Sequence, residues 1–263
     1  MTKLKFGSIH ADSLTMEEAL ERITLLASQG KGGYVVTPNI DHIVIAERNP
    51  ALRAAYADSS LSLADGKPLI WMSKIAGIPL PEKISGSDLV RPLLRRAAER
   101  SLPVYFLGSA PGVGQRAADI LRDEIPGLTV VGVDSPPLGF EADAETENEI
   151  YARMLSAGPA LALIALGAPK QELLMHRWRS RGCPVVMLGI GASLDFIAGA
   201  VKRSPRWMSD IGLEWLYRLS QDPKRLAKRY LVQDLGIIPI FARMMSVPKR
   251  DRSFDISGTG ETL

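Results

Sequence analysis

Residues 34–72 hold two short apolar runs with a helical pattern between them. The first run, Tyr34 to Val36, is followed by Thr37-Pro38-Asn39, and the second, Leu61 to Leu63, is followed by Ala64-Asp65-Gly66. This order predicts a strand–helix–strand unit with two parallel strands. Polar residues that follow parallel strands meet at the carboxyl edge of the sheet, where open α/β sheets bind ligands. The pattern therefore predicts a ligand site built from the residues that follow these two strands.

Asp65 is the carboxylate that directly follows one of these two runs, and it is our candidate for the chemical step. A plain turn also explains Asp65-Gly66, because Asp bonds its own backbone in turns and Gly readily adopts positive φ. From the local pattern alone, the turn is the commoner explanation by roughly a factor of two. Features elsewhere in the sequence are needed to choose between a plain turn and a catalytic carboxylate at Asp65.

Four further apolar runs follow, at residues 103–108, 128–133, 160–166 and 184–190, and helical patterns separate them. Alternating helices and apolar strands predict an α/β fold with a Rossmann-like, doubly wound and mostly parallel sheet. Residues 4–9 are expected to form a short edge strand before this sheet. No internal repeat is visible.

Most candidate binding residues stand where a strand gives way to a helix. The glycine-bearing turn after residues 103–108 can present backbone N–H groups to a phosphate or a sugar hydroxyl, but its glycines do not form the G-x-G-x-x-G dinucleotide fingerprint. Lys170 is placed to neutralise a phosphate and Gln171 to contact a base or sugar edge, whereas helix capping explains Ser85 and Asp88 equally well. The candidate substrate-binding residues of this part of the chain are Asn39, Ser85, Asp88, Gly108, Ser109, Gly167, Lys170, Gln171 and Asp195.

Positive charge is concentrated at the C-terminal end. The whole chain carries a net charge of +3, but residues 202–263 hold 12 Lys/Arg and 7 Asp/Glu. A basic end on a nearly neutral body favours a phosphate-rich partner such as anionic lipid, nucleotide or nucleic acid. The single cysteine, Cys183, excludes an internal disulfide, and the three scattered histidines make a structural zinc site unexpected. The N-terminus lacks the apolar core of a signal peptide, so a cytoplasmic protein is expected.

The stretch 231–247 is strongly apolar, yet it is short for a membrane span and polar residues interrupt it. Basic residues flank it, which predicts that residues 224–252 lie in the interface of an anionic membrane. Packing on the main domain or on a partner subunit explains such an amphipathic segment equally well. We therefore expect a catalytic domain at 1–200, a basic helical appendage at 201–248, and a disordered tail at 249–263.

Eight short motifs run along the chain in a fixed order: TPN at 37–39, ADG at 64–66, SGSD at 85–88, FLGS at 106–109, LGAPKQE at 166–172, GIGASLDF at 189–196, AVKRSPRW at 200–207 and GLEWLYR at 212–218. On these motifs, and over about residues 5–232, the chain closely resembles the WecG/TagA/CpsF family of bacterial glycosyltransferases. No single motif is diagnostic, but their order and spacing are specific.

The resemblance implies an inverting, metal-independent transfer of a sugar, of the N-acetylmannosamine type or a hexose. The donor would be a UDP-sugar and the acceptor a polyprenyl-diphosphate-linked saccharide, at the cytoplasmic face of the membrane. Teichoic acid, enterobacterial common antigen and exopolysaccharide are the products of such pathways. No cofactor and no nucleic-acid partner are implied. By resemblance, the catalytic residues are Asp65 as base and Thr37 as its partner, and the substrate-binding cations of the appendage are Arg218, Arg225 and Lys228, with Arg229 alongside.

The chemistry of the residues agrees with this expectation. Inverting transfer needs one base to take the proton of the attacking hydroxyl, so one carboxylate suffices. The departing diphosphate needs a metal or fixed cations, and the nearest approximation to the metal-binding Asp-x-Asp pattern, Asp143-Ala144-Glu145, stands at a predicted helix start away from the strand ends. Two other functions stay open, a nucleotide-dependent oxidoreductase and a basic adaptor that binds membrane or nucleic acid without catalysis. The sequence is also compatible with a homo-oligomer.

Overall fold

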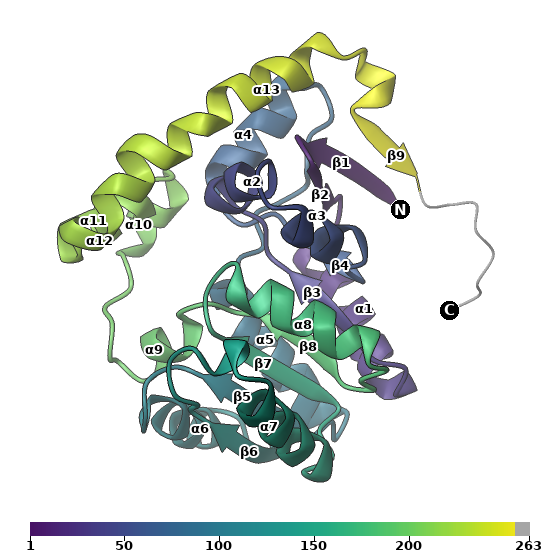
Figure 1. Cartoon of the computed structure of the whole chain (residues 1–263), viewed down its shortest axis with the longest axis vertical. Helices are drawn as coiled ribbons and strands as arrows, with labels where there is room; N and C mark the ends of the chain where they lie inside the picture. Colours follow the sequence, from purple (N-terminus) through teal and green to yellow (C-terminus); the bar gives the residue numbers. More distant parts are fainter. Residues whose placement is uncertain (256–263) are drawn as a thin grey trace.

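The computed structural model describes residues 1–255, apart from the side chains of residues 206, 210 and 225. Its centre is a six-stranded parallel sheet in the order β4-β3-β8-β7-β5-β6 (Figure 1). The parallel sheet confirms the predicted Rossmann-like α/β class. The strands are β3 (Gly33–Val36), β4 (Leu61–Ser62), β5 (Val104–Gly108), β6 (Val130–Asp134), β7 (Leu161–Ala165) and β8 (Val186–Gly189).

Helices cover both faces of the sheet, because successive residues of a strand point to opposite sides. Val35 belongs to the core on one face, and Tyr34 and Val36 belong to the core on the other. The first core is covered by α1 (Met16–Gln29), α5 (Gly86–Glu99) and α6 (Val113–Glu124). The second is covered by α2 (Ile40–Ala46), α3 (Pro50–Ala57), α7 (Ala144–Ser156) and α8 (Lys170–Ser180).

The strand order brings the carboxyl ends of β3, β4 and β8 together. The chain passes from β3 to β4, crosses to β5 and β6, and returns through β7 to β8, which pairs with β3. Beyond the last paired residues, the N–H of Leu63 donates to the carbonyl of Val36 and the N–H of Asp65 donates to that of Pro38. Helices α4 (Lys67–Ile75) and α9 (Ser193–Ile197) begin at this edge of the sheet.

The N-terminal segment differs from the predicted single edge strand. It forms a hairpin of β1 (Thr2–Phe6) and β2 (Ile9–Asp12), and Gly7 makes the turn with a φ of 60°. The other side of β1 pairs with β9 (Ser253–Asp255), so β1 is the middle strand of a separate three-stranded sheet. Together with the helical turn η4 (Lys249–Asp251), β9 shows that the predicted disordered tail is wrong for residues 249–255, while residues 256–263 lie outside the described part.

The C-terminal helices form an arm along one side of the molecule (Figure 1). Two short helices, α10 (Arg206–Asp210) and α11 (Glu214–Gln221), precede a long helical run of α12 (Pro223–Lys228), η2 (Arg229–Gln233), η3 (Asp234–Gly236) and α13 (Ile237–Ser246). Ile240 and Met244 are buried in the core that also contains α2, so the end of the arm packs on the body. The division at residue 200 stays a prediction. Within residues 1–255, no helix combines the length and the apolar character needed to cross a membrane.

Candidate active site

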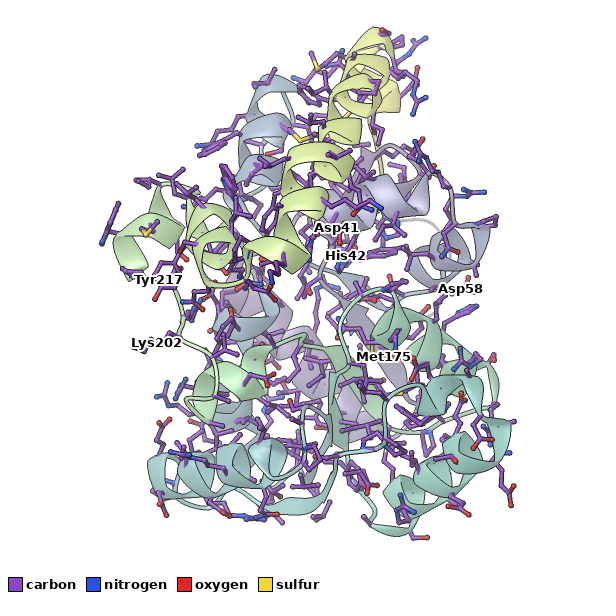
Figure 2. All side chains as sticks on the ribbon, turned by 60° about the vertical axis from the view of Figure 1, so that its left-hand side comes forward. Asp41, His42, Asp58, Met175, Lys202 and Tyr217 are labelled. Atoms are coloured by element: carbon purple, nitrogen blue, oxygen red, sulfur yellow. The ribbon has the colours of Figure 1, made fainter. Side chains whose placement is uncertain are left out.

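A cavity of about 670 Å³, here called the main cavity, opens at the carboxyl edge of the sheet beneath the C-terminal helices. The sheet side contributes residues that follow β3, β4, β7 and β8, and the appendage closes the opposite side. Figure 2 shows Lys202 on the segment that leads to the C-terminal helices, and Asp41 and His42 near the long helical run. The polar residues of the lining include Thr37, Asn39, His42, Asp65, Ser87, Gln171, Ser193, Lys202, Arg218, Gln221, Asp222, Arg229 and Tyr230.

A second cavity of about 340 Å³ lies on the other side of Asp65. The start of α4 and Lys83 form one part of its lining, and α11 with the long helical run forms another. Because Asp65 lines both cavities, it lies on the wall that they share. The residues common to the two linings are Asn39, Asp65, Arg218, Arg229 and Tyr230.

The backbone around Asp65 serves as both a turn and a site, so the two interpretations of the sequence are compatible. The N–H of Asp65 is fixed to Pro38 at 2.8 Å, and the carbonyl of Ala64 accepts from the N–H of Ile84 at 2.8 Å. Gly66 follows with a φ of 106°, a conformation that favours glycine, and caps α4. These backbone bonds hold Asp65 at the position where it lines both cavities.

The Asp65 carboxylate has the properties of a base. Its pKa is raised to about 7, first by burial and then by the negative charge of Glu214, while the positive charges of Lys83 and Arg218 act in the opposite direction. Among the described residues, no hydrogen-bond donor or ion-pair partner holds this carboxylate. A free carboxylate with a pKa near neutrality can accept a proton from a substrate hydroxyl.

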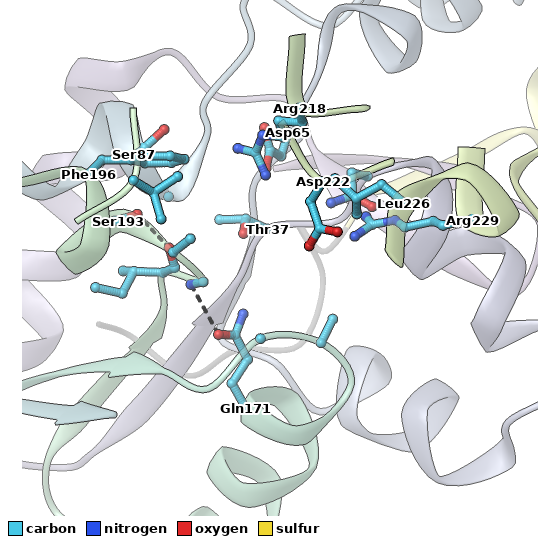
Figure 3. A pocket seen from close by; sticks show the side chains of 18 of the residues that line it. Thr37, Asp65, Ser87, Gln171, Ser193, Phe196, Arg218, Asp222, Leu226 and Arg229 are labelled. Atoms are coloured by element: carbon cyan, nitrogen blue, oxygen red, sulfur yellow. Dashed lines mark hydrogen bonds between the residues drawn. The ribbon is translucent and has the colours of Figure 1, made fainter. Parts of the chain in front are cut away.

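Thr37 lies at the end of β3, and its side chain is 6% exposed. Its hydroxyl lies 3.5 Å from the carbonyl oxygen of Gly189 at the end of the neighbouring strand β8. In Figure 3, Thr37 lies between Asp65 and Gln171. Thr37 therefore links the two strand ends and faces the main cavity.

Gln171 is held from both ends of its amide. Its oxygen accepts from the N–H of Gly191 at 3.1 Å (Figure 3), and its nitrogen donates to Glu172 at 2.9 Å. Glu172 is fully buried, and burial raises its pKa to about 7. Gln171 thus presents a fixed amide to the cavity, with a second carboxyl group beneath it.

His42, in α2, also lines the main cavity. Burial, together with the charge of Arg229, lowers the pKa of His42 to about 3. Its Nδ1 lies 2.7 Å from the hydroxyl of Tyr56. The imidazole is therefore neutral at ordinary pH and already engaged, which makes it a weaker candidate for the base than Asp65.

Two arginines of the appendage reach both cavities. Arg218 pairs with Glu214 at 2.5 Å and lies over the ring of Phe196, 5.3 Å from its centroid. Arg229 pairs with Asp41 at 3.2 Å. Lys202 lines the main cavity, and no described residue forms an ion pair with it. The side chain of Arg225, in α12, lies outside the described part.

Several predicted binding residues have other roles. Ser85 caps α5 and accepts from the N–H of Asp88, whose carboxylate pairs with Lys83 and Arg203. Lys170 forms an ion pair with Glu141. The hydroxyl of Ser109 lies 3.4 Å from Asp195. The predicted residues absent from the described linings of both cavities are Ser85, Asp88, Gly108, Ser109, Lys170, Asp195 and Lys228.

Other residues of the lining were not singled out from the sequence. Gly86, Ser87, Ser193 and Phe196 belong to the SGSD and GIGASLDF motifs, so a signal for them was present. Asp222, Leu226 and Tyr230 come from the appendage, where no strand end marks a site. Only the docking of the appendage identifies them.

Comparison with known proteins agrees with the ordered motifs. Residues 4–251 match the model of the family described as "Glycosyl transferase WecG/TagA/CpsF family". A relative from Bacillus spizizenii, an N-acetylglucosaminyldiphosphoundecaprenol N-acetyl-beta-D-mannosaminyltransferase, is 30% identical over 226 residues, which cover 86% of this chain and 80% of the relative. These matches confirm the resemblance, and the chain belongs to the WecG/TagA/CpsF family of glycosyltransferases.

Proposed function

We propose that the chain transfers a sugar from a UDP-sugar to a polyprenyl-diphosphate-linked saccharide, with inversion and without a metal. The observation that carries this proposal is the position of Asp65 on the wall between two cavities. A transferase has to bring two substrates to one base, and this arrangement provides room for both. The Bacillus relative is named for mannosaminyl transfer to a lipid-linked N-acetylglucosamine, so UDP-N-acetylmannosamine is the first donor to test.

The proposed step is a single displacement. The acceptor hydroxyl oxygen attacks the anomeric carbon of the donor, and its proton passes to the carboxylate of Asp65. The bond between the anomeric carbon and the diphosphate oxygen breaks, and its electron pair leaves with UDP. A single displacement inverts the anomeric carbon, and the pKa of about 7 at Asp65 suits a base that works near neutral pH.

Fixed cations would stabilise the charge on the departing diphosphate. Arg218, Arg229 and Lys202 all line the main cavity, which is the larger of the two and lies over the strand ends. Arg218 is held in place by Glu214, so its guanidinium is oriented before the substrate binds. Pre-oriented positive groups of this kind stabilise developing negative charge without a metal ion.

The appendage would also bring the enzyme to its lipid acceptor. Along the long helical run, Ile240 is 4% exposed, whereas Leu235 and Ile238 are 55% and 63% exposed. One face of this helix therefore packs on the body, and the opposite face is apolar and open. Together with the basic residues of 224–252, this supports peripheral binding to the anionic inner face of the bacterial membrane, where cell-surface polysaccharides begin.

The test is an assay of the purified chain with a panel of UDP-sugars, a short-chain polyprenyl-diphosphate-linked N-acetylglucosamine, and EDTA. We expect UDP release and formation of a disaccharide lipid with one donor, with inverted stereochemistry. Loss of turnover in EDTA that Mg²⁺ or Mn²⁺ restores would contradict the metal-independent mechanism. Failure of every UDP-sugar, with membrane binding retained, would favour the non-catalytic adaptor.

A further inference from the structure

The second cavity differs from the main cavity in what surrounds it. Its lining includes residues that follow β3 and β4, the start of α4 and the C-terminal helices, with Asp65 among them, whereas the residues that follow β7 and β8 line only the main cavity. In an inverting displacement the hydroxyl approaches the anomeric carbon from the side opposite the leaving group. The donor and the acceptor therefore occupy different sides of the reacting carbon. The two cavities, which meet at Asp65, provide a separate space for each substrate.

The positive charges of the second cavity are matched by described partners, with one exception. Lys83 pairs with Asp88, Arg218 with Glu214, and Arg229 with Asp41. The remaining acid of the lining other than Asp65 is Asp234, and burial raises its pKa to about 6. Lys67 is partly buried, and no hydrogen bond or ion pair joins its ammonium group to another described residue.

Exposed apolar side chains surround the outer part of this cavity. Trp215 and Leu235 belong to the lining and are 38% and 55% exposed. Trp71 packs against Gly212, where an added Cβ would lie 2.6 Å from the Trp71 ring and 3.3 Å from Lys67. Ile211 and Ile238 are exposed and adjoin lining residues in the chain. Tryptophans and aliphatic residues gathered next to a lysine are typical of a surface that contacts lipid.

We infer that the second cavity binds the lipid-linked acceptor, with Lys67 on its diphosphate and the apolar rim of Trp71, Ile211, Trp215, Leu235 and Ile238 on its polyprenyl chain. This inference rests on the proposed transferase function. The acceptor sugar then reaches inward to Asp65, while the UDP-sugar occupies the main cavity. The rim combines α4 of the catalytic domain with the appendage, so the lipid-binding surface extends beyond the predicted residues 224–252.

The experiment compares three lysine variants with the unmodified chain in detergent, with UDP-N-acetylmannosamine and the short-chain acceptor. We expect Lys67→Ala to raise the KM for the acceptor about tenfold, since a contact to a charged group is lost, and to leave the KM for the donor within about twofold. Lys202→Ala, in the main cavity, should raise the KM for the donor and leave the KM for the acceptor nearly unchanged. Lys74→Ala, on the same helix as Lys67 but in neither lining, should change neither constant.

Two further experiments distinguish the contact with the acceptor diphosphate from the contact with its polyprenyl chain. With an alkyl glycoside that carries the same sugar but no diphosphate, the effect of Lys67→Ala should disappear. Leu235→Ser, at an exposed position, should raise the KM more for a long polyprenyl chain than for a short one.

A rise in the donor KM with an unchanged acceptor KM in Lys67→Ala would overturn the inference and leave the transferase function intact. If Lys67→Ala raised the KM for the alkyl glycoside as much as the KM for the diphosphate-linked acceptor, the role of Lys67 as a diphosphate ligand would be overturned. Absence of transfer by the unmodified chain with every UDP-sugar would overturn the proposed function and the inference with it.

Discussion

The carboxylate of Glu214 lies 2.5 Å from the guanidinium of Arg218, and both side chains line the second cavity next to Asp65. Glu214 also accepts from the hydroxyl of Ser209 at 2.9 Å, which ties α11 to α10. Its negative charge is the second-largest cause, after burial, that raises the pKa of Asp65 to about 7. One acidic side chain therefore both orients a cation of the site and raises the basicity of the candidate base.

Replacing this carboxylate tests that double role. Glu214→Gln removes a negative charge near Asp65, so the pKa of Asp65 should fall and the acidic limb of the kcat/KM profile should move to lower pH by about half a unit to one unit. The maximal rate should fall as well, because Arg218 loses its ion-pair partner. Glu17→Gln, which removes a surface partner of Arg96, serves as the control and should leave the limb in place. An unshifted limb in Glu214→Gln would refute the electrostatic link to Asp65.

Asp65 should also lower the stability of the fold at alkaline pH. Its pKa of about 7 in the folded chain lies above the ordinary value of 3.8, so between these values the folded state holds a proton that the unfolded chain has released. The free energy of unfolding contributed by this group is therefore greatest below pH 4 and is lost as the pH rises through 7. Asp65→Asn mimics the protonated group at every pH. It should raise Tm by a few degrees at pH 8, which corresponds to roughly 1–3 kcal/mol, and by much less at pH 5.

Thermal unfolding at the two pH values measures this difference. Asp123→Asn, on the exposed side of α6, is the matched control and should give the same small Tm change at both. A Tm gain in Asp65→Asn that is no larger at pH 8 than at pH 5 would contradict the raised pKa.

Glu172 is expected to act as a neutral support for Gln171. It is fully buried, its pKa is raised by burial to about 7, and its Oε2 has no hydrogen-bond partner among the described residues. Glu172→Gln keeps an oxygen that can accept from Gln171 and removes the titratable group, so stability at pH 8 should be unchanged or higher. Glu172→Ala removes the acceptor of the Gln171 amide nitrogen and should lower the free energy of unfolding by about 1–3 kcal/mol. Urea unfolding measures the free energy of unfolding of both variants. An equal loss of stability in Glu172→Gln and Glu172→Ala would show that the hydrogen bond to Gln171 does not stabilise the fold.

The fold followed from the sequence wherever local pattern and tertiary packing agree. Buried parallel strands are apolar throughout, so the runs at 103–108, 160–166 and 184–190 identified β5, β7 and β8. The N-terminal hairpin was missed because its two strands are short and their turn rests on a single glycine, Gly7. Ser253–Asp255 becomes a strand through pairing with β1, a partner some 250 residues away in the chain, and no local signal announces that contact.

The site was predictable where a residue directly ends a strand, and less so where a helix orients it. Thr37 and Asp65 follow β3 and β4, and both line the main cavity. Lys170 and Gln171 are neighbours at the start of α8, but successive residues of a helix point about 100° apart. Gln171 consequently faces the cavity, whereas Lys170 turns toward Glu141. Residues such as Asp222 and Tyr230 join the site only through the docking of the appendage.

The central claim is that Asp65 removes the proton of the acceptor hydroxyl while the UDP-sugar is held by other residues. The most direct measurement is the single-turnover rate of Asp65→Asn at saturating donor and acceptor, with the affinity for UDP determined by calorimetry on the same sample. The account predicts that the rate falls by about 100-fold to 10,000-fold, while the affinity for UDP changes by less than about threefold. A variant that keeps more than about a tenth of the rate, with UDP bound as before, would contradict the assignment of Asp65 as the base.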